Sequence, residues 1–301
     1  MKQGCISCVL VLLILGCRPD GAPVKQFPEE FKELDVMTFN VLYSTSNQSV
    51  VATIRESGAD IIGLQEISKD RLATIAQSLK YDYHGFPETS ANLSSQDTGI
   101  LSRFEIVQVF TDGVVVQVNK NLKVAIFACH LSPYPYEPYD FRDGVITTAQ
   151  QAVASASFRL EEINPVIAQI NTLKSSGIPI FLTGDFNEPS HLDWTAETAN
   201  ANLHFNKVVA WPVSSAIASA SLVDAWRNQL HNPVNFPGIT WTPWESANEV
   251  YDRIDIIYHA NTSALTLQDI RTVAGTGDGA DITVAGYESD HYAVIATYKI
   301  N

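Results

Sequence analysis

Residues 178–194, IPIFLTGDFNEPSHLDW, start as an apolar strand and become polar within a few positions. Asp185 and Asn187 follow the apolar run and are separated by one aromatic residue. A turn is one explanation, because Gly, Asp and Asn tolerate the backbone angles of strand ends and Pro189 prevents further pairing. A functional site is the other explanation. Residues two apart in an extended chain face the same side, so a carboxylate and an amide would be presented together.

Other strand-like runs also end or begin with polar residues that core packing does not require. Asn40 ends VMTFN, Glu66 ends DIIGLQE, and His130 ends KVAIFACH. DRID, residues 252–255, opens a further strand, and SDH, residues 289–291, opens the last one. Each residue alone is more often a solvated strand end or a satisfied core residue than a ligand. Together with GDFN they supply the carboxylates, amides and histidines that metal-assisted phosphoryl chemistry uses.

From residue 34 onward, apolar runs of strand length alternate with amphipathic segments. Predicted strands, rich in β-branched and aromatic residues, cover 36–43, 59–66, 98–104, 105–110, 113–119, 123–131, 178–187, 252–259 and 291–300. Predicted helices cover 49–58, 68–80 and 147–177. Pro165 is expected to kink the last helix or to start a second one, and Gly177 to end it. Many strands with a few interspersed helices predict an α/β sandwich whose sheets are covered by helices.

The order of these motifs is similar to that of one known family. TFNV, LQE, HLSP, GDFN, DRID and SDH follow one another as in the endonuclease/exonuclease/phosphatase superfamily, which has the DNase I-like fold. The resemblance extends over almost the whole chain after the N-terminal leader. It implies a four-layer α/β/β/α sandwich, in which two mixed β-sheets pack face to face with helices outside. It also favours the functional explanation of GDFN over the turn.

The resemblance implies a role for each matched position. Glu66 corresponds to the principal Mg²⁺ ligand, and Asn40 and Asp290 are expected near the metal. Asp185 corresponds to the carboxylate that orients or deprotonates the attacking water, and Asn187 to the amide that steadies the water and the phosphoryl oxygen. Mn²⁺ or Ca²⁺ are possible substitutes for Mg²⁺, and the number of ions is left open.

The two histidines complete the set that the resemblance implies. His130 and His291 correspond to the pair that contacts the reacting phosphate. An aspartate of DRID is expected to orient His291. Asp255 is preferred to Asp252 for this role, because it aligns with the R-x-D pattern of the family.

The loop HLSPYPYEPYDFRDG, residues 130–144, follows the first of these histidines directly. It is either a rigid surface loop, stiffened by its prolines, or a substrate contact. In the second case Tyr136 and Tyr139, with Tyr134 beside them, would stack on a base or sugar, and Arg142 would grip a phosphate.

The N-terminus is typical of an export signal. Residues 1–17 join a lysine to an apolar run too short to span a bilayer and end in ILGC, which resembles a bacterial lipoprotein box. We expect cleavage before Cys17, lipidation of this cysteine and anchoring in the bacterial envelope, at the periplasm or cell surface. An ordinary secretory signal or a short membrane anchor is the alternative. Residues 18–32 would be a tether and residues 33–301 a single domain, with Cys129 as its lone cysteine and no internal disulfide.

The charge of the chain bears on its partners. It has 33 Asp and Glu against 19 Lys and Arg, a formal net charge of −14, so long nucleic acid is disfavoured. We therefore expect a metal-dependent phosphodiesterase that acts on a small or extracellular phosphoester and meets membranes only through its lipid anchor. A nuclease is the first alternative. A sphingomyelinase-like phospholipase is a weaker one, because residues 276–288 have no aromatic hairpin that could enter a membrane, and a non-catalytic binding protein on the same fold is the last.

Overall fold

The computed structural model describes residues 31–86 and 98–301, which form two mixed β-sheets. In order across the sheet, the first consists of β12 (Ile282–Val284), β11 (Leu265–Gly275), β13 (Ala293–Ile300), β1 (Glu33–Asn40), β2 (Ile61–Gln65), β4 (Thr98–Ser102) and β3 (Asp82–Gly85). The second consists of β5 (Glu105–Val109), β6 (Gly113–Gln117), β7 (Lys123–His130), β8 (Ile180–Asp185), β10 (Asp255–Ala260) and β9 (Leu222–Asp224).

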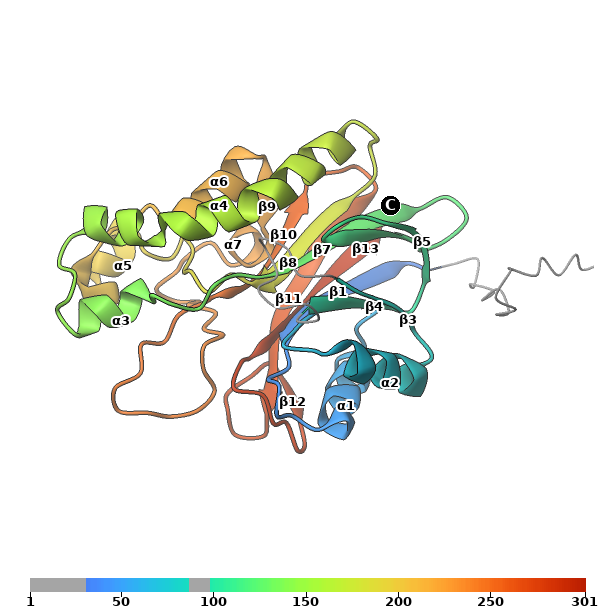
Figure 1. The fold of residues 1–301 in the computed structure, drawn as a ribbon, viewed down its shortest axis with the longest axis horizontal. Coiled ribbons are helices and arrows are strands. Elements are labelled where there is room, and N and C mark those ends of the chain that lie inside the picture. Colours follow the sequence, from blue (N-terminus) through green and yellow to red (C-terminus); the bar gives the residue numbers. More distant parts are fainter. Residues whose placement is uncertain (1–30, 87–97) are drawn as a thin grey trace, which may run out of the picture.

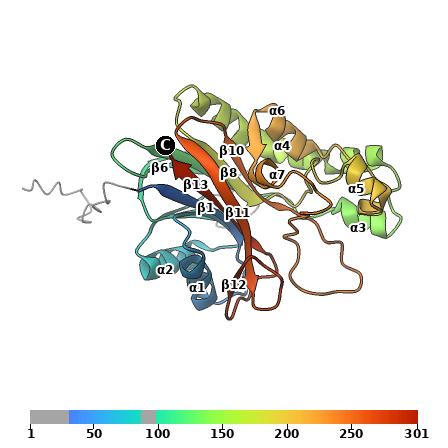
Figure 2. The same cartoon turned by 180° about the vertical axis from the view of Figure 1, so that it is seen from behind.

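The two sheets pack face to face, and helices cover their outer faces (Figures 1 and 2). Between the sheets lies an apolar core that includes Val36, Ile61, Ile126, Phe181 and Val294, all of them buried. Alternating residues of each strand point into this layer, so the sheets bury one face each against the other. The predicted four-layer α/β/β/α sandwich is confirmed.

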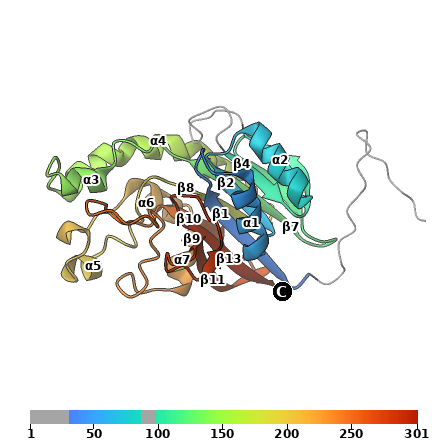
Figure 3. The same ribbon diagram turned by 90° about the horizontal axis from the view of Figure 1, so that it is seen from below.

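Each outer face has its own pair of long helices. The first sheet is covered by α1 (Asn47–Ser57) and α2 (Lys69–Leu79), which lie in front of the strands in Figure 3. The second sheet is covered by α4 (Ala149–Lys174) and α6 (Pro212–Ser219). Pro165 lies inside α4, which continues across it, so the prediction that it starts a second helix is wrong. The helix ends before Gly177, as expected.

Several elements, most of them short, have no counterpart in the sequence prediction. They are the strands β3, β9, β11 and β12, and the helices α3 (Glu137–Arg142), α5 (Ala196–Asn200), η1 (His204–Asn206), α6 and α7 (Ala225–Gln229). Most are too short to show a clear periodicity. In β11 the alternation of apolar and polar residues is interrupted at Gln268 and Asp269, which are both exposed and lie where the register with β13 shifts. Its pairing with β13 stabilises it as a strand.

The strand register brings the polar ends together. β1 runs parallel to β2 and β7 parallel to β8, so the carboxyl ends within each pair lie side by side. His130 is paired with Asp185 across β7 and β8, and Asp185 with Asp255 across β8 and β10. Residues far apart in the chain therefore meet at one edge of the sandwich.

Some sequence predictions concern residues that the structure does not describe. The leader 1–17 and most of the tether 18–32 lie outside the described ranges, as do three of the four cysteines. Cys129 is described, and it is a buried free thiol. Within residues 31–86 and 98–301, no helix has the length and apolar character needed to cross a membrane.

Candidate active site

The strands β2, β7 and β8 end at a cavity of about 430 Å³. Its lining includes eight of the residues predicted from the sequence: Glu66, His130, Tyr136, Tyr139, Asp185, Asn187, Asp290 and His291. Asn40 and Asp255 contact these residues from behind the lining. Arg142 does not line this cavity.

Asn40 connects the two sheets at the base of the cavity. Its buried side-chain Nδ2 lies 3.0 Å from Oδ2 of Asp185 and 3.2 Å from Oε1 of Glu66. Its Oδ1 accepts a hydrogen bond from the backbone N–H of Leu42 at 3.1 Å. The amide oxygen therefore faces the backbone, and the amide nitrogen holds two carboxylates in place. Asn40 lies beside the expected metal position, where it orients the acidic groups.

Asp185 is the centre of the polar group. Its Oδ2 lies 3.6 Å from Nε2 of His130 and 3.8 Å from Nε2 of His291. Its Oδ1 accepts a hydrogen bond from the backbone N–H of Asn187 at 2.9 Å. Burial and the charge of Asp255 raise the pKa of Asp185 to about 6, although the two histidines act to lower it. A carboxylate with this pKa is ionised near neutral pH and can accept a proton from water.

Asp255 orients His291. Nδ1 of His291 lies 2.8 Å from Oδ2 of Asp255, and both side chains are buried. The aspartate is itself positioned by the hydroxyl of Thr240, which accepts its backbone N–H at 2.9 Å. Burial lowers the pKa of His291, but the charges of Asp255 and Asp185 outweigh this effect and raise the pKa to about 10. His291 is therefore a cation at neutral pH and can stabilise negative charge on a phosphoryl oxygen.

Asp252 has a different environment from Asp255. It accepts hydrogen bonds from the indole of Trp194 at 3.0 Å and from the hydroxyl of Tyr136 at 3.1 Å. Among the described residues it forms no hydrogen bond or ion pair with His130 or His291, and its Oδ1 lies 3.6 Å from Nδ1 of His204. Of the two aspartates in DRID, it is Asp255 that contacts His291.

Two residues of the site have backbone angles that disfavour side chains. Glu66 has φ 58° and Asn187 has φ 47°, in the left-handed region. Neighbouring groups hold both side chains. The backbone N–H of Tyr43 donates to Oε2 of Glu66 at 3.1 Å, and Nδ2 of Asn187 donates to the carbonyl of Leu131 at 2.9 Å. Such conformations persist where the surrounding structure enforces them, which is common at functional sites.

Glu66 and Asp290 fit a divalent cation. Both line the cavity, and Oδ1 of Asp290 is buried without a hydrogen-bond partner among the described residues. Burial raises the pKa of Asp290, and the nearby charge of Glu66 raises it further. Two carboxylates that face one space suit a hard ion, which prefers oxygen ligands.

A second group of possible metal ligands, formed by Asp185, Asp255 and His291, is less suited to an ion. Ligand atoms of Asp185, Asp255 and His291 lie within 4.8 Å of one another. However, His291 already shares its Nδ1 with Asp255, and with a pKa near 10 both of its ring nitrogens carry protons. A protonated imidazole has no lone pair for a metal, so this group fits proton transfer and phosphate contact better.

Some residues of the loop 130–144 line the cavity, and others lie outside it. Tyr134 is 71% exposed at the rim, whereas Tyr136 is buried and stands edge-on to Tyr139, with ring centroids 4.9 Å apart. Arg142 instead pairs with Asp143 at 2.7 Å and donates to the carbonyl of Asn248 at 2.7 Å. The predicted phosphate contact of Arg142 is therefore not part of the geometry seen here.

Two cavity residues were missing from the sequence prediction. Tyr43 supplies both its ring and its backbone N–H to the site. Trp241 packs its ring against His291, with centroids 4.8 Å apart. Trp241 lies in the motif TWTP, which is conspicuous in the sequence but has no polar group that would point to a reaction. Tyr43 lies three residues after the end of β1, and a tyrosine there gives no signal either.

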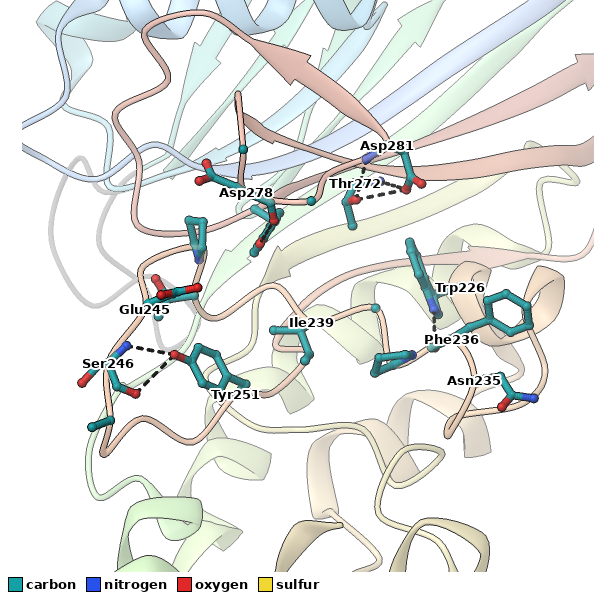
Figure 4. Close-up of a pocket in the computed structure, with 18 residues that line it drawn as sticks. Trp226, Asn235, Phe236, Ile239, Glu245, Ser246, Tyr251, Thr272, Asp278 and Asp281 are labelled. Carbon is teal, nitrogen blue, oxygen red and sulfur yellow. Dashed lines mark hydrogen bonds between the residues drawn. The ribbon is translucent and has the colours of Figure 1, made fainter. Parts of the chain in front are cut away.

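A larger cavity, of about 1250 Å³, lies beside the site (Figure 4). Its charged lining residues are all acidic: Glu245, Asp278 and Asp281. The hydroxyl of Thr272 donates to Asp281 (Figure 4). The hydroxyl of Tyr251 accepts a hydrogen bond from the backbone N–H of Ser246 and donates one to its carbonyl (Figure 4). A surface of this charge repels a phosphate, so size alone does not make it the reaction site.

Comparison with known proteins places the fold and the site in context. An uncharacterized protein of Caenorhabditis elegans is 28% identical over 293 residues, which cover 87% of this chain and 90% of that protein. A Danio rerio TDP2 structure, complexed with a single-strand DNA product, matches 88% of this chain and 98% of its own, with 16% identity and a TM-score of 0.55. The mannosyl-6-phosphatase Bt3783 of Bacteroides thetaiotaomicron matches 88% and 99%, with 15% identity and a TM-score of 0.54. These structural likenesses show a shared fold.

The family model described as "Endonuclease/Exonuclease/phosphatase family" matches residues 37–291, which include every predicted catalytic and metal-site position. That description names enzymes that hydrolyse phosphate esters, and the family generally depends on divalent metal ions. The chain belongs to the endonuclease/exonuclease/phosphatase family.

Proposed function

We propose that this protein is a Mg²⁺-dependent phosphodiesterase that hydrolyses a compact phosphoester. The observation that carries the proposal is the pairing of a base and a cation in one cavity. Asp185, with a pKa of about 6, and His291, with a pKa of about 10, lie 3.8 Å apart at the cavity wall. Near neutral pH these are the charge states that water activation and phosphoryl stabilisation need.

The residues of the chain would divide the reaction between them. Asp185 takes a proton from a water whose oxygen attacks phosphorus, opposite the oxygen of the leaving alcohol. The bond from phosphorus to that oxygen breaks as the new bond forms. His291 and His130 contact the phosphoryl oxygens, and Asn187 steadies the water. Mg²⁺ held by Glu66 and Asp290 would neutralise phosphoryl charge and lower the pKa of a bound water or leaving group.

The cavity lining supports a compact substrate. Among the described residues, no lysine or arginine lines the cavity, whereas Tyr43, Tyr134, Tyr139 and Trp241 do. Such a lining suits one phosphate group joined to a planar or sugar portion that rests on aromatic rings. The strong negative charge of the chain also disfavours long polyanions.

Two other classes of phosphoester substrate remain as alternatives that the experiment below distinguishes. The Danio rerio TDP2 structure holds a DNA product, which favours a nuclease as the second candidate. The Bacteroides thetaiotaomicron protein is named as a phosphatase of mannosyl 6-phosphate, which favours a monoesterase. A nuclease that neutralises several phosphates would lose affinity steeply as salt rises, whereas a compact substrate would show a shallow dependence.

The test is a panel of monoesters, diesters and plasmid DNA, each with Mg²⁺, with Mn²⁺, with Ca²⁺ and with excess chelator. We expect the diesters to be preferred and chelation to abolish turnover. Glu66→Gln should weaken metal binding, and Glu56→Gln, at an exposed position of α1, is the matched control. Full activity in chelator would exclude the metal mechanism. Rapid cleavage of plasmid at low enzyme concentration would make the protein a nuclease.

We also propose that the protein is exported and anchored by a lipid on Cys17. The apolar leader and the ILGC motif support this, and both precede the described residues. Cys17→Ala should move the protein from the membrane fraction to the soluble fraction and remove incorporation of labelled fatty acid. Unchanged membrane association of this variant would favour a membrane anchor that needs no lipid.

A further inference from the structure

We propose that Glu249 is a positioning residue that sets how the cavity holds the non-reacting portion of its substrate. The proposal rests on the phosphodiesterase function above and concerns the specificity of the same site. Glu249 lies near the end of residues 242–250, here called the 242–250 segment, the orange loop beneath α3 in Figure 1. It does not line the catalytic cavity itself.

One carboxylate oxygen of Glu249 accepts hydrogen bonds from three donors. Oε1 accepts hydrogen bonds from the hydroxyl of Tyr139 at 2.5 Å, from the indole Nε1 of Trp241 at 3.1 Å and from the backbone N–H of Val250 at 2.9 Å. The same indole also donates to the hydroxyl of Tyr139 at 3.0 Å. Glu249, Tyr139 and Trp241 thus form a closed triangle, which fixes the angle between two aromatic rings.

Both rings of this triangle are walls of the catalytic cavity. Tyr139 and Trp241 line it, and Trp241 packs against His291 with centroids 4.8 Å apart. Without Glu249, each ring would lose its anionic acceptor and gain rotational freedom about its side-chain bonds. A substrate group that stacks on the rings would then have to order them on binding, which lowers affinity.

Arg142 acts on the same segment. Its Nη1 donates to the carbonyl of Asn248 at 2.7 Å, and its guanidinium lies 4.3 Å from the ring centroid of Tyr139. Arg142 therefore supports the loop and the tyrosine ring, which differs from the phosphate contact expected from the sequence. α3 therefore holds the 242–250 segment through two side chains, and one of them belongs to the triangle.

The reacting groups are held independently of Glu249. The backbone of Trp241 exchanges two hydrogen bonds with Asp252, at 3.0 and 3.1 Å. Asp255 holds His291 at 2.8 Å, and Asn40 holds Asp185 at 3.0 Å. Loss of Glu249 should therefore change the binding of the non-reacting portion and leave the chemical step nearly intact.

The experiment compares two diesters with the same leaving group. Thymidine 5′-(p-nitrophenyl phosphate) carries a base and sugar that can reach the rings, and methyl p-nitrophenyl phosphate carries a methyl group in their place. For Glu249→Ala we expect KM for the thymidine diester to rise about tenfold, with KM for the methyl diester and both kcat values within about twofold of the wild type. Such a change in KM alone reports lost binding of the substrate rather than lost stabilisation of the transition state.

Three variants make the result specific. Glu249→Gln should restore most of the affinity, because its amide oxygen still accepts from the tyrosine and the indole. Tyr139→Phe keeps the ring but removes one donor, so it should raise KM for the thymidine diester by less than Glu249→Ala does. Glu245→Ala is the matched control on the same segment, because this carboxylate is exposed and lines the larger cavity of Figure 4.

The outcomes separate this inference from the proposed function. Turnover of neither diester by the wild type would count against the phosphodiesterase itself. Turnover by the wild type with equal changes for the two diesters, or with no change in Glu249→Ala and Tyr139→Phe, would overturn the role of Glu249 and leave the phosphodiesterase intact. A thermal unfolding curve for each variant verifies folding. If Glu249→Ala does not fold, the comparison of Glu249→Gln with Tyr139→Phe decides.

Discussion

Two groups of buried charges differ in how completely they are paired. The first, the Arg253 cluster, consists of Asp193, Asp224, Arg227 and Arg253. Arg253 donates to Asp193 at 3.0 Å and to both oxygens of Asp224 at 3.0 and 2.7 Å. Arg227 donates to Asp193 at 2.6 Å. Two cations therefore balance two carboxylates, and this cluster joins α7 and β9 to the chain before β10.

The catalytic cavity is the second group, and its charges are only partly matched. One oxygen of Asp255 and one of Asp290 are buried without a hydrogen-bond partner in the part of the chain that the structure describes. The pKa of Asp185 is raised by burial. Asp185 and Asp290 line the cavity, and Asp255 lies directly behind the lining. Buried charge alone therefore does not mark a site in this protein. Incomplete pairing next to a cavity does, because the missing partner can be a ligand.

The largest expected effect is the loss of stability on breaking the Arg253 cluster. Arg253→Ala would leave Asp193 and Asp224 buried without their main cation, which should lower the free energy of unfolding by about 3–5 kcal/mol. Urea denaturation of the wild type and the variant measures this change. A stable variant with a strongly reduced kcat would instead place Arg253 in the reaction.

Substitutions in the catalytic cavity should lower activity more than they lower stability. Asp185→Asn and His291→Ala should each lower kcat on the order of a hundredfold or more, because they remove the base and the cation. The unfolding free energy of Asp185→Asn should change less than that of Arg253→Ala, because this substitution removes a buried carboxylate and does not leave one without its cation. Steady-state kinetics and urea denaturation of the same samples decide. Near wild-type kcat in either variant would refute its role.

The pH dependence of activity tests the charge states of Asp185 and His291. Asp185 must be ionised to accept a proton, so kcat/KM should rise as pH increases through about 6. His291 must be protonated, so activity should fall as pH rises through about 10. Asp255→Asn removes a charge that raises the pKa of His291, and it should move the upper limb to lower pH. A pH–rate profile with the upper limb unmoved would mean that another group sets it.

The smallest expected effect concerns Glu188, a buried carboxyl group next to the site. Burial raises its pKa from 4.5 to about 8. Its folded pKa is raised, so its contribution to stability is fully present below about pH 4.5 and is lost as pH rises through about 8. Glu188→Gln stays neutral and can still accept from the backbone N–H of Val213, as Glu188 does at 2.8 Å. Thermal unfolding between about pH 6 and about pH 9 should show a smaller decrease for the variant than for the wild type.

The main features of the fold were predictable from local patterns. The core strands β1, β2, β7, β8, β10 and β13 are apolar runs with β-branched residues, and each one has a counterpart in the prediction. The edge strands β3, β9 and β12 and the irregular β11 were not predicted, because neighbouring strands stabilise them more than their own sequences do. Pro165 does not start a second helix, because the flanking residues of α4 bury an apolar face that outweighs one lost hydrogen bond.

The candidate site, like the fold, was predictable only in part. GDFN, LQE and SDH predicted that acidic and amide groups would lie at strand ends, and the structure brings those side chains together. Arg142 shows the limit of such reasoning. Its position in a polar loop near His130 is compatible with a phosphate contact, but its actual partners are Asp143 and the backbone of Asn248. Nothing local in the sequence distinguishes these two outcomes.

Local sequence specifies which residue types end the strands and which faces of the strands are apolar, because both depend on side chains one or two positions apart. Which of these residues touch depends on the packing of the whole chain. Asn40 meets Asp185 across 145 positions of sequence, and Tyr139 meets Glu249 across 110. Such contacts depend on strand register, on side-chain rotamers and on competition between partners, and these are settled only when the two sheets and their loops pack together.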